Sequence, residues 1–122
     1  MGNSEQGLKN ELQLRLFNFA VAIIRLIRKL PKSKEYNVIS YQIIKSSTSS
    51  GANYDEAQGA VSKADFVNKI AISLKEMRES NYWIRLIIAT TDKNEDWLKM
   101  RQESSELMNI LGSIYSKTSM KR

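Results

Sequence analysis

The sequence predicts an all-α protein folded as an up-and-down four-helix bundle. Apolar residues recur at intervals of three and four over long segments, which is the periodicity of amphipathic helices. No segment alternates apolar and polar residues for more than a few positions, so strands are not expected. The 122 residues are enough for one hydrophobic core and too few for two ordinary domains, so residues 1–122 are expected to form a single domain.

The first predicted helix covers approximately residues 8–30 and ends before Pro31, the only proline. Apart from Gln13 and Arg28, the polar positions between Glu11 and Lys32 share one strip about 100° wide, which leaves about twice that width apolar. One apolar face can cover the core of the protomer while another covers a partner subunit, so a homo-oligomer is favoured over a monomer with a central helix. The strip contains Glu11, Arg15, Asn18, Ala22, Arg25, Lys29 and Lys32.

The second predicted helix covers approximately residues 34–58, although its second half, KSSTSSGANYDEAQGA, has the composition of a flexible linker. A three-helix protein would leave residues 32–59 as a connection, and connections of that length are uncommon in compact domains. Residues 46–57 are therefore predicted to be helical, with Ser47 or Ser50 buried where a neighbouring backbone approaches. The bulky residues keep near-helical spacing throughout: Tyr36, Ile39, Ile43, Ile44, Tyr54 and Ala57.

The last two predicted helices cover approximately residues 62–90 and 95–117. Ser62 and Asp65 have the spacing of a capping box at the start of the third helix. Asp92 or Asn94 can cap the fourth helix, and Lys117 lies at its negative end.

The composition argues against most catalytic and metal sites. The chain has no cysteine and no histidine, which excludes disulfides and the usual zinc ligands. Di-iron bundles combine glutamates with Glu-x-x-His pairs, so they cannot be assembled here either. A serine nucleophile would lack a base, and no glycine-rich phosphate loop occurs. We therefore expect a protein that is not an enzyme and has no cofactor and no metal.

The sequence contains three closely spaced pairs of carboxylates. Glu103 and Glu106 are expected on a solvated helix face, because charged pairs at this spacing are usually exposed. Glu56, Glu76 and Glu79 are expected to form ion pairs or caps within the bundle or between subunits. The third pair, Asp55 and Glu56, is adjacent in sequence.

The net charge of +6 is unevenly distributed. Between residues 8 and 34 there are seven basic residues and one acidic residue, Glu11, which indicates a polyanionic partner. Because phosphates are bound through charge without strict geometry, such binding would be largely independent of sequence. The predicted nucleic-acid-binding residues are Arg15, Arg25, Arg28, Lys29, Lys32 and Lys34. The alternative is that these charges only keep a bundle soluble.

A cytoplasmic protein without membrane contact is expected. The longest apolar run, residues 16–27, is interrupted by Asn18 and Arg25 and is shorter than the roughly 20 residues of a spanning helix. The first residues lack the basic region of a signal peptide.

Residues 46–87 resemble the small bacterial four-helix-bundle proteins encoded in intervening sequences of large-subunit ribosomal RNA genes. The same fold is shared with the accessory variability determinant of diversity-generating retroelements. The resemblance is carried by the serine-rich half-helix, Ala52-Asn53, Glu56-Ala57, Gly59, Ser62, Asp65-Phe66, Leu74-Lys75-Glu76, Glu79 and Tyr82-Trp83. It implies protomers that close into a ring, commonly of five, with a basic surface. For the retroelement relatives it also implies binding of nucleic acid and of a reverse transcriptase.

Two functional hypotheses follow from the sequence. The first is a non-enzymatic, ring-forming scaffold that binds RNA or DNA through the basic strip of the first helix. The second is a protein-interaction or structural module that binds no nucleic acid. The sequence leaves open the type of nucleic acid, the protein partner, the number of subunits and the branch of the family.

Overall fold

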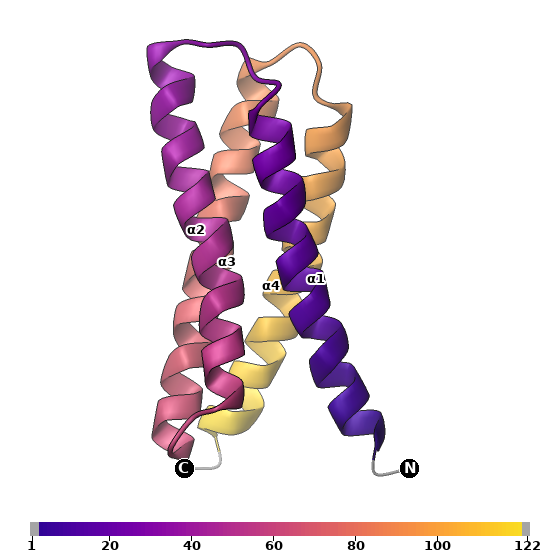
Figure 1. The fold of residues 1–122 in the computed structure, drawn as a ribbon, viewed down its shortest axis with the longest axis vertical. Coiled ribbons are helices and arrows are strands. Elements are labelled where there is room, and N and C mark those ends of the chain that lie inside the picture. The colour runs from indigo at the N-terminus through magenta and orange to yellow at the C-terminus, as the bar shows by residue number, and fades with distance from the viewer. Residues whose placement is uncertain (1–2, 121–122) are drawn as a thin grey trace.

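The fold is described by a computed structural model, which covers the backbone of residues 3–120 and the side chains of residues 7, 8 and 10–120. The chain forms four helices and, over this range, no strand: α1 (Asn3–Ile27), α2 (Lys34–Gln58), α3 (Lys63–Thr90) and α4 (Glu95–Ser119). Each helix runs antiparallel to the next (Figure 1). The all-α four-helix prediction is confirmed. We call the end that holds the α1–α2 and α3–α4 connections the loop end.

Capping residues set most helix limits where the sequence predicts them. The Ser33 hydroxyl accepts a hydrogen bond from the Tyr36 amide at 3.1 Å, and the Ser62 hydroxyl accepts one from the Asp65 amide at 3.0 Å. Each bond satisfies an amide that has no partner inside its own helix. At the other end of α2, the Gly59 amide donates to the carbonyl of Glu56 at 3.0 Å.

The limits of α1 differ from the predicted residues 8–30. The helix begins at Asn3 and ends at Ile27, and residues 28–30 form a turn. Pro31 disfavours the helical conformation of the residue before it, so the helix ends before Leu30 rather than at it.

Buried serines line the contact between α2 and α3. The Ser50 hydroxyl donates to the Ser73 carbonyl at 2.8 Å, and the Ser73 hydroxyl donates to the Ser50 carbonyl at 2.7 Å. Further along, the hydroxyls of Ser46 and Ser80 are 2.7 Å apart. A hydroxyl on one helix reaches the backbone of the other only if the two backbones approach closely. We call these four residues the serine seam; Ser47, whose hydroxyl donates within α2 to the Ile44 carbonyl, is also buried. The prediction of helix over residues 46–57 with Ser47 or Ser50 buried is confirmed.

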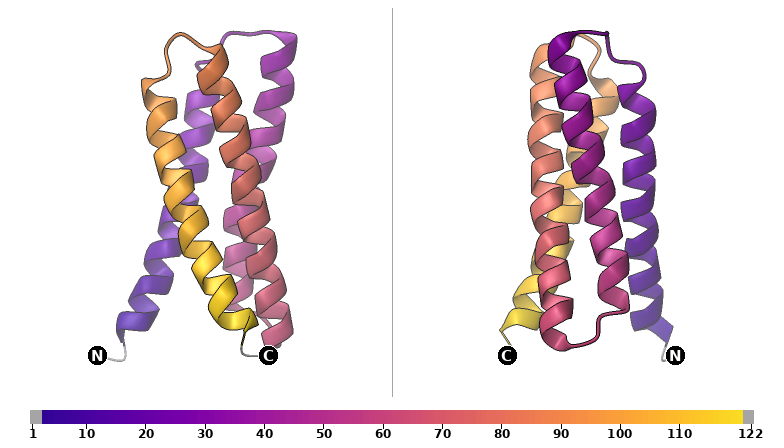
Figure 2. Two further views of the ribbon diagram at one scale, coloured as in Figure 1. Left: turned by 180° about the vertical axis from the view of Figure 1, so that it is seen from behind. Right: turned by 60° about the vertical axis from the view of Figure 1, so that its left-hand side comes forward.

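The contact between α1 and α4 is less extensive. Both views of the bundle show these helices moving apart from the loop end toward the start of α1 and the end of α4 (Figure 2). Leu8, near the start of α1, is accordingly 66% exposed, whereas Leu16 two turns later is 1% exposed.

No helix in the described range is long and apolar enough to cross a membrane.

Replacing Ser50 with leucine is expected to destabilise the protein by about 1–3 kcal/mol, because the larger side chain would force apart the backbones of α2 and α3. Thermal and urea unfolding measure the effect. Ala52→Leu, at an exposed position of the same helix, is the matched control and should change the free energy of unfolding by less than about 0.5 kcal/mol. Equal stability of the two variants would contradict close packing at the serine seam.

Candidate nucleic-acid interface

Five of the six predicted nucleic-acid-binding residues lie together at the loop end. Arg25 lies in the last turn of α1, Arg28, Lys29 and Lys32 lie in the α1–α2 connection, and Lys34 begins α2. All five side chains are exposed, and none forms an ion pair with another described residue. We call these five residues the loop-end basic surface. Their charges remain available to a ligand in solution.

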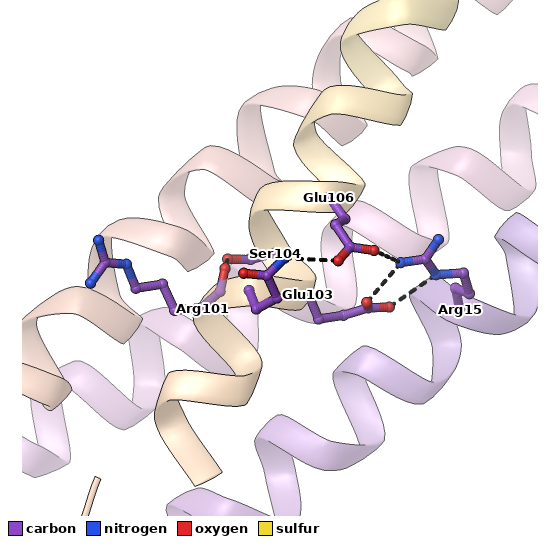
Figure 3. A network of polar contacts seen from close by, with 6 residues as sticks. Arg15, Arg101, Glu103, Ser104 and Glu106 are labelled. Carbon is purple, nitrogen blue, oxygen red and sulfur yellow. Dashed lines mark hydrogen bonds and ion pairs between the residues drawn. The ribbon is translucent and has the colours of Figure 1, made fainter. Parts of the chain in front are cut away.

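The sixth residue, Arg15, is engaged within the protomer. Its Nη2 lies 2.7 Å from Oε1 of Glu103 and 3.0 Å from Oε1 of Glu106, and its Nε donates to Oε2 of Glu103 at 3.0 Å. Figure 3 shows the guanidinium of α1 and the two carboxylates of α4 directed toward one another. The expectation of a solvated face is confirmed for Glu106, whose side chain is 49% exposed, whereas the Glu103 side chain is half-buried at 32% exposed. These carboxylates hold α4 against α1.

The same contacts shift the pKa values of the groups involved. The hydrogen bond with Glu103 raises the pKa of Arg15 above its ordinary value. The pKa of Glu106 is lowered, first by a hydrogen bond from Gln102 and then by Arg15. Both shifts favour the charged forms. Because two carboxylates oppose the charge of Arg15, we assign this residue to the α1–α4 contact and not to the interface.

The structure adds two cations that local sequence reasoning missed. Lys93 lies in the α3–α4 connection and Lys99 in α4, and both side chains are exposed. Lys93 and Lys29 line a pocket of about 570 Å³, which we call the loop-end pocket. Lys99 and Arg25 line a neighbouring hollow of about 400 Å³. An up-and-down topology brings the start of the fourth helix beside the end of the first. The predicted number of helices and the positions of the turns could therefore have shown that Lys93 and Lys99 lie near Arg25 and Lys29.

Of the three carboxylates expected to form ion pairs or caps, Glu56 forms an ion pair, whereas Glu76 and Glu79 form none with another described residue of the protomer. Glu56 forms an ion pair with Lys69 at 3.2 Å, which confirms the expectation of ion pairing for Glu56. Glu76 is half-buried, and this burial, followed by a hydrogen bond with Glu79, raises its pKa. Among the described residues, no three side chains of the types that bind metals come together.

A second surface feature is an apolar face shared by α1 and α2. Leu14 and Phe17 of α1 are 59% and 65% exposed, and Tyr41 of α2 is 65% exposed. Gly51 of α2 lies against Leu16, so the two helices pack side by side here. We call the following residues the α1–α2 apolar face: Leu14, Phe17 and Ile24 of α1, and Tyr41 and Ile44 of α2. Ile24 is half-buried. The prediction that α1 has more apolar surface than the core covers agrees with these exposed side chains.

The chain resembles a known protein family in sequence and a solved protein in both sequence and fold. The sequence model of the 23S rRNA-intervening sequence protein family matches residues 9–113. The chain belongs to this family. It is also 39% identical to a solved protein of unknown function from the S23 ribosomal protein family of Bacteroides thetaiotaomicron VPI-5482. The match has a TM-score of 0.78 and covers 85% of this chain and 97% of that chain. None of the curated proteins compared matches the chain.

These comparisons confirm the resemblance to the intervening-sequence proteins. The matched range includes all of α2 and α3 and most of α1 and α4. It therefore contains the serine seam, the loop-end basic surface and the Arg15 contact. The solved relative is itself of unknown function. The surface of this family member is therefore the main indication of what it binds.

Replacing Arg15 with methionine is expected to lower the free energy of unfolding by about 0.5–1 kcal/mol at neutral pH and low salt, because the two-point contact with Glu103 is lost. Arg25→Met is the matched control, since Arg25 is an exposed arginine of the same helix without an ion pair. It should stay within about 0.5 kcal/mol of the wild type. If both variants unfold alike in urea, the contact does not stabilise the bundle.

The stabilisation by Arg15 should also depend on pH. A carboxyl group with a lowered pKa in the folded state stabilises the protein above the unfolded-state glutamate pKa of about 4.3. That stabilisation is lost as the pH falls through the lowered folded-state pKa of Glu106. The difference between wild type and Arg15→Met should therefore shrink below about pH 4. Urea unfolding over a pH series measures it, and an undiminished difference at low pH would contradict the pairing.

Proposed function

We propose that this chain acts in the cytoplasm as a non-enzymatic scaffold that binds RNA or DNA through the loop-end basic surface. The observation that carries the proposal is the set of five exposed basic side chains, free of ion pairs within the described range, between Arg25 and Lys34. A polyanion releases its counterions when it binds such a surface, which supplies affinity that is largely independent of sequence.

The distribution of charge within the protomer supports this assignment. Arg15 and Lys69 form ion pairs with carboxylates of the neighbouring helices, whereas the basic residues of the loop end do not. If these charges served only solubility, acidic and basic residues would be expected to be interspersed evenly. The segment from Arg25 to Lys34 contains no acidic residue, so its charges are of one sign along the chain; carboxylates approach it from Glu35 and, at the pocket, from Asp92 and Asp96.

We propose further that the protein works as a homo-oligomer in which a second copy covers the α1–α2 apolar face. Contiguous exposed apolar surface of this kind marks interaction sites. A ring of five is the arrangement that the family resemblance implies. Repetition of the loop-end basic surface around a ring would place several phosphate-binding surfaces on one particle, and modest contacts would then combine into useful avidity.

The second candidate function is a protein-interaction module without nucleic-acid binding. The α1–α2 apolar face favours it, because exposed aromatic and aliphatic side chains suit the core of a protein interface. A reverse transcriptase is the partner that the resemblance to the retroelement relatives suggests. Recovery of a protein partner that is unaffected by nuclease and by the charge reversals below would favour this second function.

Reversing two charges of the loop-end basic surface, with Arg25→Glu and Lys29→Glu together, is expected to weaken binding to RNA and DNA at least tenfold at low salt. Fluorescence anisotropy over a salt series measures both affinity and its salt dependence. Lys63→Glu with Lys117→Glu changes the net charge equally near the opposite end of the bundle and is the matched control. Absence of salt-dependent binding by the wild type to RNA, single-stranded DNA and duplex DNA alike would exclude the proposed function.

Placing a charge in the α1–α2 apolar face, with Phe17→Asp, is expected to shift the protein from an oligomer to a monomer, because an unpaired carboxylate would be buried between subunits. Light scattering coupled to gel filtration measures the mass. Val61→Asp is the control, since Val61 is 92% exposed in the α2–α3 connection. A wild type that remains monomeric at high concentration would refute the oligomer.

A further inference from the structure

We propose that the loop-end pocket receives an unpaired nucleobase of the bound strand, so that the protein prefers single-stranded nucleic acid to duplex. This inference rests on the proposed nucleic-acid binding and adds the form of nucleic acid that is recognised. The loop-end pocket is lined by apolar and acidic residues as well as by basic ones, so it is distinct from the loop-end basic surface.

The pocket has the size and the rigid walls of a small-molecule site. Its volume of about 570 Å³ lies within the range of about 300–1,000 Å³ for such sites. Leu26, Leu30 and Pro31 form apolar parts of the wall, together with Trp97 and Tyr36. Trp97 is only 3% exposed and Tyr36 only 8%, so the core holds both rings in place. Since the two rings are nearly closed to solvent, the accessible apolar lining is mainly aliphatic, and such a lining suits contact with the face of a flat heterocycle.

The polar lining distinguishes a nucleobase from a bare phosphate. Lys29 and Lys93 line the pocket, but so do the carboxylates of Asp92 and Asp96. Two carboxylates would repel an isolated anion. A nucleobase, by contrast, presents both donors and acceptors along its edges. The aspartates can accept from its amino groups and the lysines can donate to its carbonyl and ring nitrogen atoms.

The pocket is continuous with the loop-end basic surface. Lys29 belongs to both. An adjacent hollow of about 300 Å³ is lined by Arg28 and Lys32 and shares Tyr36 and Pro31 with the pocket. A strand whose phosphates lie on Arg28 and Lys32 therefore passes beside the opening. In a duplex the same base is paired and stacked, and extruding it costs a few kcal/mol. Single strands avoid this cost.

Three probes of equal length test the proposal at low salt: a labelled oligodeoxyadenylate, an abasic oligodeoxynucleotide and an oligo(dA)·oligo(dT) duplex. We expect the wild-type protein to bind the first about tenfold more tightly than either of the others, since contact with a single base is typically worth that much. Equal affinity for the base-bearing and abasic strands would overturn the pocket while leaving the proposed function in place. Absence of binding to all three would overturn both.

A variant that fills the pocket localises the effect. Thr91 lines the pocket, and Thr91→Trp introduces a large side chain there. The control is Asn109→Trp, which introduces the same side chain at an exposed position of α4. Thr91→Trp should bind the oligodeoxyadenylate only as tightly as the abasic strand, with abasic binding unchanged. Asn109→Trp should behave as the wild type. If a folded Thr91→Trp variant still binds the oligodeoxyadenylate about tenfold more tightly than the abasic strand, the proposal is overturned.

A spectroscopic measurement keeps the test independent of whether that variant folds. The chain has two tryptophans, so Trp83→Phe leaves Trp97 as the only one. Saturating deoxyadenosine monophosphate should quench the emission of Trp97, with an affinity at least a hundredfold weaker than that of the strand. No quenching would show that the pocket does not take a base. A mononucleotide affinity equal to that of the strand would identify free nucleotides as the ligand and overturn binding of a strand.

Discussion

The close approach of α2 and α3 along the serine seam is the constraint on which the remaining structure depends. Ser50 and Ser73 each donate a hydrogen bond to the backbone carbonyl of the other, so both the separation and the register of the two helices are fixed. Buried hydroxyls without partners would be costly, and no buried side-chain polar atom among the described residues lacks one. The start of α2 and the end of α3 are thereby placed together at the loop end.

The opposite side of the bundle is held by a different kind of interaction. The Arg15 contact joins α1 to α4 through partly exposed charges, with 29% of the Arg15 side chain and 32% of the Glu103 side chain accessible. Exposed ion pairs weaken in salt, whereas buried hydrogen bonds between neutral groups are screened much less. The bundle therefore combines a salt-insensitive contact between α2 and α3 with a salt-sensitive contact between α1 and α4. The last turn of α1 and the connection that follows it carry four of the five residues of the loop-end basic surface, so this surface adjoins the salt-sensitive side.

Two surfaces of α1 can then serve different purposes without competing. The α1–α2 apolar face lies along the middle of the helix, whereas the basic residues gather at its end and in the connection that follows. A subunit docked on the apolar face would leave the loop end accessible. Within the loop end itself, Asp92 and Asp96 interrupt the positive charge at the pocket, which is why the pocket and the basic surface suit different parts of one nucleotide.

The sequence by itself determined the helices and the cationic segment, because helix periodicity, capping residues and a local run of charge are all properties of neighbouring residues. It also identified the serine-rich stretch as helix, since a loop of that length would be incompatible with a compact domain. Only the tertiary structure decided that Arg15 faces Glu103 and Glu106, that Ser50 pairs with Ser73, and that Lys93 joins Lys29 at one pocket. These residues are far apart in sequence, and the direction of each side chain depends on the rotation and separation of two packed helices, which no local pattern specifies.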